Sequence, residues 1–200
     1  SAEDAAGFAA FERDNRGPFE QFNEPHPQRY YSAAGLARAF CELLARQDPD
    51  RYVTRVAVLP GSSRWVGTGS LSVHPQRSGT VGVVVYQTDR QHWRQGVARA
   101  LLSHLIDEAH ALSLARVDAL IVSDNTVSLH LLRRAGFKAA GWSLPAALLR
   151  GPVDCLQLSR PLRGAVGPVL SGSHVHLSRD SASSTCRWRS ASCALSCGLR

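Results

Sequence analysis

A run of small and polar residues from Trp93 to Ala98 is the segment of this 200-residue chain whose types and spacing most directly suggest chemistry. An amphipathic pattern follows it, and the first amides of a helix have no acceptor within the helix. Those amides lie at the positive end of the helix dipole and can bind a diphosphate. Gly96 has no Cβ to hold phosphate oxygens away from the backbone, and Arg94 and Arg99 can add charge-assisted hydrogen bonds. The spacing predicts a diphosphate site, with plain packing of a helix on a sheet as the alternative.

Residue types exclude other common sites. Lys138 is the only lysine, so the chain has no GxxxxGKS/T phosphate loop, whose lysine contacts the phosphates. The number of cysteines is odd, they form no CxxC pair, and no HExxH motif occurs. We therefore expect neither a metal site nor a disulfide framework. The cysteines are Cys41, Cys155, Cys186, Cys193 and Cys197.

Two periodicities alternate along residues 1–163 and predict the elements that must position this segment. Val, Thr and aromatic residues dominate the strands, which are separated by Pro, Gly and Ser. Apolar residues recur every three to four positions in the helices; Ser32 suits an N-cap and Gly136 the position after a C-cap. The predicted strands cover 52–59, 65–73, 80–88, 116–123, 137–142 and 153–158. The predicted helices cover a segment near the N-terminus, 32–47, 94–112 and 125–135.

This order of elements predicts an α/β (α+β) fold. Two short turn segments join the first three strands, so these strands should form antiparallel hairpins. The later strands are separated by helices, which favours a mixed sheet. We expect a mostly antiparallel sheet of about six to seven strands, flanked by about four helices.

Composition divides the chain near residue 163. Hydrophobic residues make up 44% of the sequence, enough for a core, but residues 164–200 are rich in Ser, Arg and Cys and follow neither period. We expect one domain over 1–163 and a poorly ordered tail over 164–200. The net charge of +7 divides into +4 and +3 between them, so no specific nucleic-acid partner is expected. No long apolar run or secretory signal occurs, which favours a cytoplasmic protein without a membrane span.

Four short motifs, taken in order, resemble the GCN5-related N-acetyltransferase (GNAT) superfamily. Its diphosphate loop is usually written Arg/Gln-x-x-Gly-x-Gly/Ala; Gly96 and Ala98 match its last two positions, and Trp93 stands where Arg or Gln is commonest. Trp-x-x-Gly-x-Ala is similar to the branch that acetylates the N-termini of ribosomal proteins. The other motifs are Asn125-Thr126-Val127-Ser128, Ala135-Gly136-Phe137 and Phe11-Glu12-Arg13-Asp14-Asn15-Arg16.

The resemblance implies that acetyl-coenzyme A (acetyl-CoA) is the acetyl donor, without a metal. Its pyrophosphate would lie over the loop and the start of the next helix, and its pantetheine arm would run along the preceding strand like an added strand. Backbone amides there would polarise the thioester carbonyl. The implied donor-binding residues are Tyr86, Gln87, Thr88, Trp93, Arg94, Gln95, Gly96, Val97, Ala98, Arg99 and Asn125.

The motifs do not include the superfamily's usual acid. Many superfamily members place a Tyr seven residues after the Asn, as general acid for the thiolate, and here that position is Leu132. Ser128 lies on the same predicted helix face, and some members of the similar branch use a Ser there as the proposed acid. The alternative is that Ser128 is simply a small helix residue. Asp89 and His92 flank the loop as possible bases, or as solvated loop residues.

The resemblance also implies direct attack by an amine, which must be neutral. An α-amino group has a pKa of about 7.7–8.0, against about 10.4 for lysine, so a protein or peptide N-terminus is the preferred acceptor. A small-molecule amine is the alternative acceptor, and a non-catalytic acyl-CoA-binding protein is the alternative outside the enzyme class. We expect a monomer or a homodimer.

Overall fold

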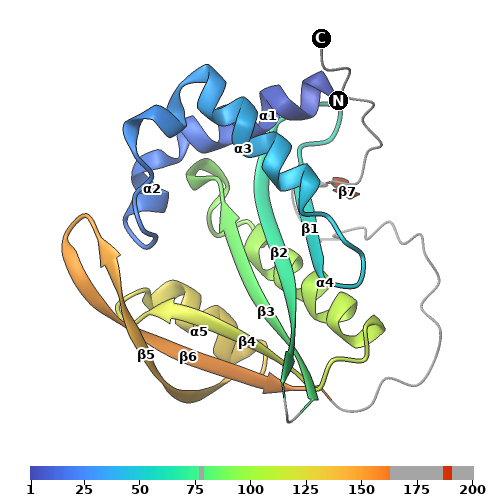
Figure 1. The fold of residues 1–200 in the computed structure, drawn as a ribbon, viewed down its shortest axis with the longest axis vertical. Coiled ribbons are helices and arrows are strands. Elements are labelled where there is room, and N and C mark those ends of the chain that lie inside the picture. The colour runs from blue at the N-terminus through green and yellow to red at the C-terminus, as the bar shows by residue number, and fades with distance from the viewer. Residues whose placement is uncertain (77–78, 163–186, 191–200) are drawn as a thin grey trace.

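The computed structural model describes residues 1–76, 79–162 and 187–190, whose strands form one seven-stranded sheet with helices on both faces (Figure 1). The order of the strands across the sheet is β5-β6-β4-β3-β2-β1-β7. The helices are α1 (Ala2–Asp14), α2 (Arg16–Glu20), α3 (Ala33–Ala45), α4 (Val97–Ala111) and α5 (Thr126–Arg134), with short 3-10 turns η1 (Gln28–Tyr31) and η2 (Arg90–His92). The strands are β1 (Tyr52–Val58), β2 (Trp65–Gln76), β3 (Gly79–Thr88), β4 (Arg116–Val122), β5 (Lys138–Leu148), β6 (Gly151–Pro161) and β7 (Arg187–Ser190).

The sheet is antiparallel except at its centre. Strands β1, β2 and β3 form the two predicted hairpins, and β4, β6 and β5 pair antiparallel on the other side. The central β3–β4 pair is parallel, as a strand–helix–strand connection through α4 requires. The predicted mixed, mostly antiparallel α/β fold is therefore confirmed.

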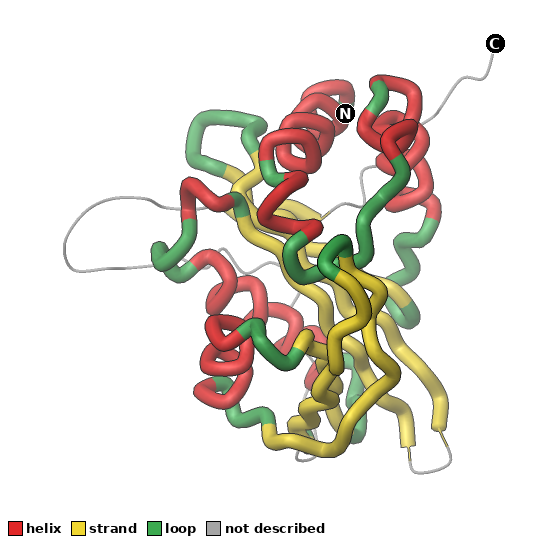
Figure 2. Tube along the Cα trace, turned by 90° about the vertical axis from the view of Figure 1, so that its left-hand side faces the viewer, coloured by secondary structure: helices red, strands yellow, loops and turns green. Residues whose placement is uncertain are grey.

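Two layers of helix cover the sheet. Helices α1 and α3 bury aromatic residues against β1 and β2, with Phe8 and Phe40 packed around Trp65. On the opposite face α4 packs on β1–β4, while α5 closes the core over β4. Figure 2 shows these layers from the side. Helix α4 approaches β2 closely because Gly67 has no side chain: a Cβ there would come within 2.8 Å of the Val97 side chain.

Most of the predicted elements are present, although β5 and β6 extend beyond their predicted bounds of 137–142 and 153–158. Three further differences concern the helices and the tail. Helix α4 begins at Val97 rather than near residue 94, because Arg94 and Gly96 take positive φ values of 62° and 85°. The five-residue helix α2 was not predicted, since one and a half turns carry too few residues to show a period. Residues 187–190 pair with β1 as the edge strand β7; the rest of the predicted poorly ordered tail lies outside the described residues.

The two predicted helix boundaries that rest on single residues are confirmed. The Ser32 hydroxyl accepts a hydrogen bond of 3.1 Å from the amide of Gly35 at the start of α3. Gly136 follows α5 with φ of 87°, the left-handed conformation expected just after a helix. Among the described residues, no helix is long and apolar enough to cross a bilayer.

Candidate functional site

Strands β3 and β4 separate at the centre of the sheet. They pair over only three positions, from Val81 with Arg116 to Val83 with Asp118. Both strands continue beyond this point, β3 to Thr88 and β4 to Val122, without pairing to each other. Figure 1 shows them meeting at the bottom of the view and spreading upward like the sides of a V. We call this opening the V-shaped gap.

Near the end of β3, the backbone groups at the edge that faces the V-shaped gap are not paired with β4. The amide of Asp89 donates to the carbonyl of Val66 on β2, at 3.0 Å. Because the bonding direction alternates along a strand, the backbone groups of Gln87 also point to β2. Those of Tyr86 and Thr88 then point to the opposite edge, where β4 has moved away. This edge can therefore pair with an extended ligand.

A tight loop connects β3 to α4 and leaves the helix N-terminus open. Gly96 is the N-cap residue of α4 and no side chain caps the helix. The first intrahelical bond runs from Ala100 to the carbonyl of Gly96, so the amides of Val97, Ala98 and Arg99 have no intrahelical acceptor. A Cβ added at Gly96 would meet nothing within 4 Å. The loop thus presents unpaired amides beside an open space.

Positive charge surrounds this helix start. The side chains of Arg94 and Arg99 are exposed and make no ion pair within the part of the chain that the structure describes.

The indole of Trp93 is 45% exposed and its Nε1 donates to the carbonyl of Thr88 at 3.2 Å. This bond fixes the ring at the point where β3 ends. The side chain of Gln95 donates back to the carbonyl of Gln91.

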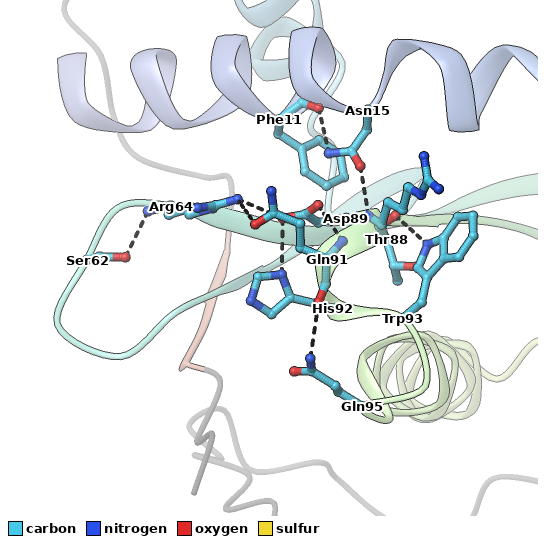
Figure 3. A network of polar contacts seen from close by, with 11 residues as sticks. Phe11, Asn15, Ser62, Arg64, Thr88, Asp89, Gln91, His92, Trp93 and Gln95 are labelled. Atoms are coloured by element: carbon cyan, nitrogen blue, oxygen red, sulfur yellow. Dashed lines mark hydrogen bonds and ion pairs between the residues drawn. The ribbon is translucent and has the colours of Figure 1, made fainter.

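A buried carboxylate organises the loop from inside (Figure 3). Asp89 is only 3% exposed, and its oxygens accept from the amide of Gln91 and the guanidinium of Arg64, with the His92 ring 3.1 Å away. The expectation that Asp89 is a solvated loop residue is therefore wrong. With its oxygens occupied by these partners, Asp89 shapes the loop and is a poor candidate for a base.

Asn15 connects the first helix to the same loop. Its side chain is 1% exposed; its amide nitrogen donates to the carbonyl of Phe11 and its oxygen accepts from the amide of Arg90, at 3.0 and 2.8 Å (Figure 3). In the sequence, Asn15 stands out only as part of the motif from Phe11 to Arg16. No local signal could show a bond between residues 75 positions apart.

The start of α5 lies near the V-shaped gap and brings two hydroxyl groups close. Asn125 caps the helix by accepting from the amide of Ser128, at 3.2 Å. The Tyr86 side chain of β3 packs against the core that contains Leu129 and Leu132. Burial raises the pKa of Tyr86, and the neighbouring Ser128 hydroxyl lowers it by less. Leu132 is fully buried, so the position where many superfamily members have Tyr is a core residue here.

Two buried carboxylates in the helical layer were not identified from the sequence. Glu12 is 8% exposed and accepts a hydrogen bond from the Tyr30 hydroxyl at 3.3 Å; burial raises its pKa to about 7, with the Tyr30 bond opposing. Glu20 pairs with Arg16 and accepts from the Tyr31 hydroxyl. Their burial depends on how the helices pack, which no local pattern reveals.

The sheet face opposite α4 and α5 is partly open beside the V-shaped gap. Val85 on β3 and Leu120 on β4 are 57% and 54% exposed. The segment after α2 reaches across to the far side of the gap, where Phe22 packs against Val122 and the Glu24 carboxylate accepts from the amide of Ala147 on β5. An apolar patch therefore lies beside the gap, on the face away from α5.

The family model for the acetyltransferase (GNAT) family matches residues 8–137. The chain belongs to this family. It is accordingly an acyltransferase of GNAT type, and the predicted resemblance is confirmed. Within the described residues of this GNAT chain, no group of three or more His, Cys, Asp or Glu is placed to hold a metal ion.

Individual relatives agree with this assignment. The GNAT chain is 27% identical over 139 residues to the probable N-acetyltransferase YjcK of Bacillus subtilis (strain 168), covering 69% of this chain and 77% of that protein. Among solved structures it resembles the ribosomal-protein-S5-alanine acetyltransferase from Vibrio fischeri (TM-score 0.70, 20% identity, 80% of this chain and 89% of that one). It also resembles Mycobacterium smegmatis RimJ in complex with CoA-disulfide (TM-score 0.70, 19% identity, 80% and 78%). At these identities the solved structures show the shared fold.

Proposed function

We propose that this GNAT enzyme transfers the acetyl group of acetyl-CoA to the N-terminal amine of a protein or peptide. The observation that carries the proposal is the V-shaped gap between β3 and β4, which has unpaired amides at one end and an open apolar face on one side. Such a gap can hold a long, thin donor while leaving its reactive end accessible to a second substrate.

The residues around the gap fit the chemistry of acetyl-CoA. The amides of Val97, Ala98 and Arg99 suit a diphosphate, and the open space at Gly96 leaves room for its oxygens. Exposed Arg94 and Arg99 complement its charge. The backbone groups of Tyr86 and the amide of Thr88, at the edge of β3 that faces the gap, suit the amide groups of the pantetheine arm, and Asn125 caps the start of α5.

The other side of the gap favours a peptide as the acceptor. Val85 and Leu120 offer apolar contact beside the reacting end of the donor, and the segment that bears Phe22 and Glu24 borders the same face. A peptide N-terminus also loses its proton more easily than a lysine side chain at neutral pH. The names of two structural relatives, a ribosomal-protein-alanine acetyltransferase and RimJ, support this acceptor class.

The thioester, when bound, supplies an acetyl carbon to which the amine nitrogen bonds while the carbon–sulfur bond breaks. This chain's residues hold the two substrates in register. A backbone amide at the free edge of β3 would donate to the carbonyl oxygen as negative charge develops there.

An acceptor panel tests the proposal. The protein is mixed with acetyl-CoA and peptides that carry free N-termini, the same peptides with blocked N-termini and an internal lysine, and small amines such as polyamines, and free thiol is followed over time. We expect turnover with free N-termini and little with blocked peptides. Turnover confined to small amines would favour the alternative acceptor. CoA binding without turnover on any amine would favour a non-catalytic acyl-CoA-binding protein.

A further inference from the structure

Asp118 on β4 is a buried carboxylate that the rest of the site leaves unexplained. It is 5% exposed, whereas Leu120, two residues further along the same face of the strand, is 54% exposed. Arg116 Nε donates to both of its oxygens at 3.1 and 3.2 Å, Ser159 Oγ donates to Oδ1 at 2.6 Å, and Gln157 Nε2 donates to Oδ2 at 3.2 Å. A buried charge is stable only when it is paired and hydrogen-bonded in this way.

These bonds belong to a network that crosses the point where the V-shaped gap begins. On β4, the pairing with β3 starts at Arg116 and ends at Asp118, so the two charged residues lie at the two ends of the paired stretch. Asp118 is bonded to two residues of β6, and Arg116 Nη2 donates to the Oε1 of Gln76 on β2 at 2.9 Å. The network therefore connects β2 to β6 across the junction of β3 and β4.

The angle between β3 and β4 at this junction controls the width of the gap further along. Thr88 lies five residues beyond Val83, the last paired residue of β3. This is about 17 Å of strand, so a rotation of about 5° at the junction would move Thr88 by about 1.4 Å relative to β4. Hydrogen bonds to an extended ligand tolerate much less, because N–H···O distances lie between about 2.7 and 3.2 Å. The backbone bonds of three residue pairs resist such a rotation, and the side-chain network adds bonds on both sides of them.

Resting on the proposed function, we propose that Asp118 is a positioning residue, whose network fixes the angle between β3 and β4 and so the width of the gap that receives the pantetheine arm. Asp118 acts without touching the donor. It anchors β4 to β6 and holds Arg116 in place to reach β2, so that β4 leaves β3 at one fixed position. Because these bonds exist before the donor binds, the gap is preorganised for it.

The test compares CoA with ADP, which carries a diphosphate but lacks the pantetheine arm. Calorimetry measures the Kd of both ligands for the full-length wild type, Asp118→Ala and Asp118→Asn. We expect Asp118→Ala to weaken CoA binding about tenfold or more and ADP binding less than about twofold, because only the arm lies in the altered gap. Asp118→Asn should restore CoA binding to within about threefold of the wild type, since its amide can make most of the same hydrogen bonds.

Gln76→Ala tests the same network with little risk to folding, because Gln76 is exposed. It should weaken CoA binding about two- to fivefold and leave ADP binding unchanged, since it removes one of the bonds that cross the junction. With an acceptor from the panel, Asp118→Ala should raise the KM for acetyl-CoA by about the same factor as the Kd and change kcat less.

Glu20→Ala is the matched control for lost stability. Glu20 is also a buried carboxylate that accepts from an arginine Nε and a hydroxyl, those of Arg16 and Tyr31, but it lies in the helical layer. Its loss should lower the melting temperature about as much as Asp118→Ala does, because each variant leaves an arginine without its carboxylate. The Kd of Glu20→Ala for CoA should stay unchanged.

The outcomes separate this inference from the proposed function. Absence of CoA binding by the wild type would defeat the proposed function itself. If CoA binds and its Kd is the same in the wild type, Asp118→Ala and Gln76→Ala, the inference is overturned and the proposed function stands. Equal losses of CoA and ADP affinity, an equal loss of CoA affinity in Glu20→Ala, or no recovery in Asp118→Asn would likewise overturn it. Should Asp118→Ala fail to fold, an unchanged Kd in Gln76→Ala alone overturns the inference.

Discussion

At the scale of single residues, Gly96 combines the two properties that the diphosphate site requires. Its φ of 85° is readily adopted by glycine alone, and the space where a Cβ would stand is open. The conformation ends the loop and starts α4, and the open space lets a ligand approach the amides. One residue thus sets both the backbone path and the access to it.

Gly96→Ala should weaken CoA binding at least tenfold, because the added Cβ would occupy the space for phosphate oxygens, and should also lower stability by about 1 kcal/mol or more through strain. Gly61→Ala is the matched control: Gly61 has a φ of 73° and an equally open Cβ position in the β1–β2 turn. It should lose similar stability and keep its affinity. Calorimetry and thermal unfolding measure both. Unchanged affinity in Gly96→Ala would contradict the assignment of this loop to the diphosphate.

The buried Glu12 side chain should make the stability of the fold depend on pH. Burial raises its pKa in the folded chain from 4.5 to about 7, so the folded state binds this proton more tightly than the unfolded state. The stabilisation from Glu12 is therefore complete below about pH 4.5 and is lost as the pH rises to about 7. Relative to Glu12→Gln, the wild type should lose up to about 3 kcal/mol over this range. Denaturant unfolding at a series of pH values measures it, and parallel curves for the two proteins would contradict it.

At the scale of elements, the end of α1 holds the loop in place. Asn15→Ala would remove the bond to the amide of Arg90 as well as the bond to the carbonyl of Phe11. We expect a loss of about 1–3 kcal/mol in stability and weaker CoA binding, because a looser loop no longer preorganises the amides. Asn23→Ala is the control, since the Asn23 side chain likewise donates to a carbonyl four residues earlier, that of Phe19. Equal effects of the two variants on the Kd would refute this role of Asn15.

Helices and strands could be predicted wherever a single hydrophobic period dominates the sequence. The residues at which they begin and end could not. The alternating β strands and the apolar stripe of α4 could be identified from the sequence, as could the hairpins, because each pattern is local. The predicted start of α4 is three residues too early, because the residue type of Arg94 does not indicate its positive φ. The donor loop could be found from Gly96 and Ala98 through resemblance, but Asp89 and Asn15 bond to residues that are distant in sequence. Only the packed fold brings them together.

At the scale of the whole molecule, the site is built from elements that all precede residue 163. A chain that ends at residue 163 should therefore bind CoA within about twofold of the full chain. It would also uncover the edge of β1 that β7 pairs with, and an uncovered edge invites association between copies. Calorimetry and light scattering test both effects. A large loss of affinity would show that residues 164–200 contribute to the site and that the predicted domain boundary is wrong.

The short parallel pairing at the centre of the sheet has a mechanical consequence. Three residue pairs alone connect the β1–β3 half, with its helices, to the β4–β6 half along the backbone of the sheet. A donor bound between the halves would contact both β3 and β4 and so couple the motions of the two halves. Loading with CoA should raise the melting temperature and slow hydrogen exchange at residues 84–88 and 119–122 together. The two halves of the sheet would then move least relative to each other when acetyl-CoA is bound, before the acetyl group is transferred.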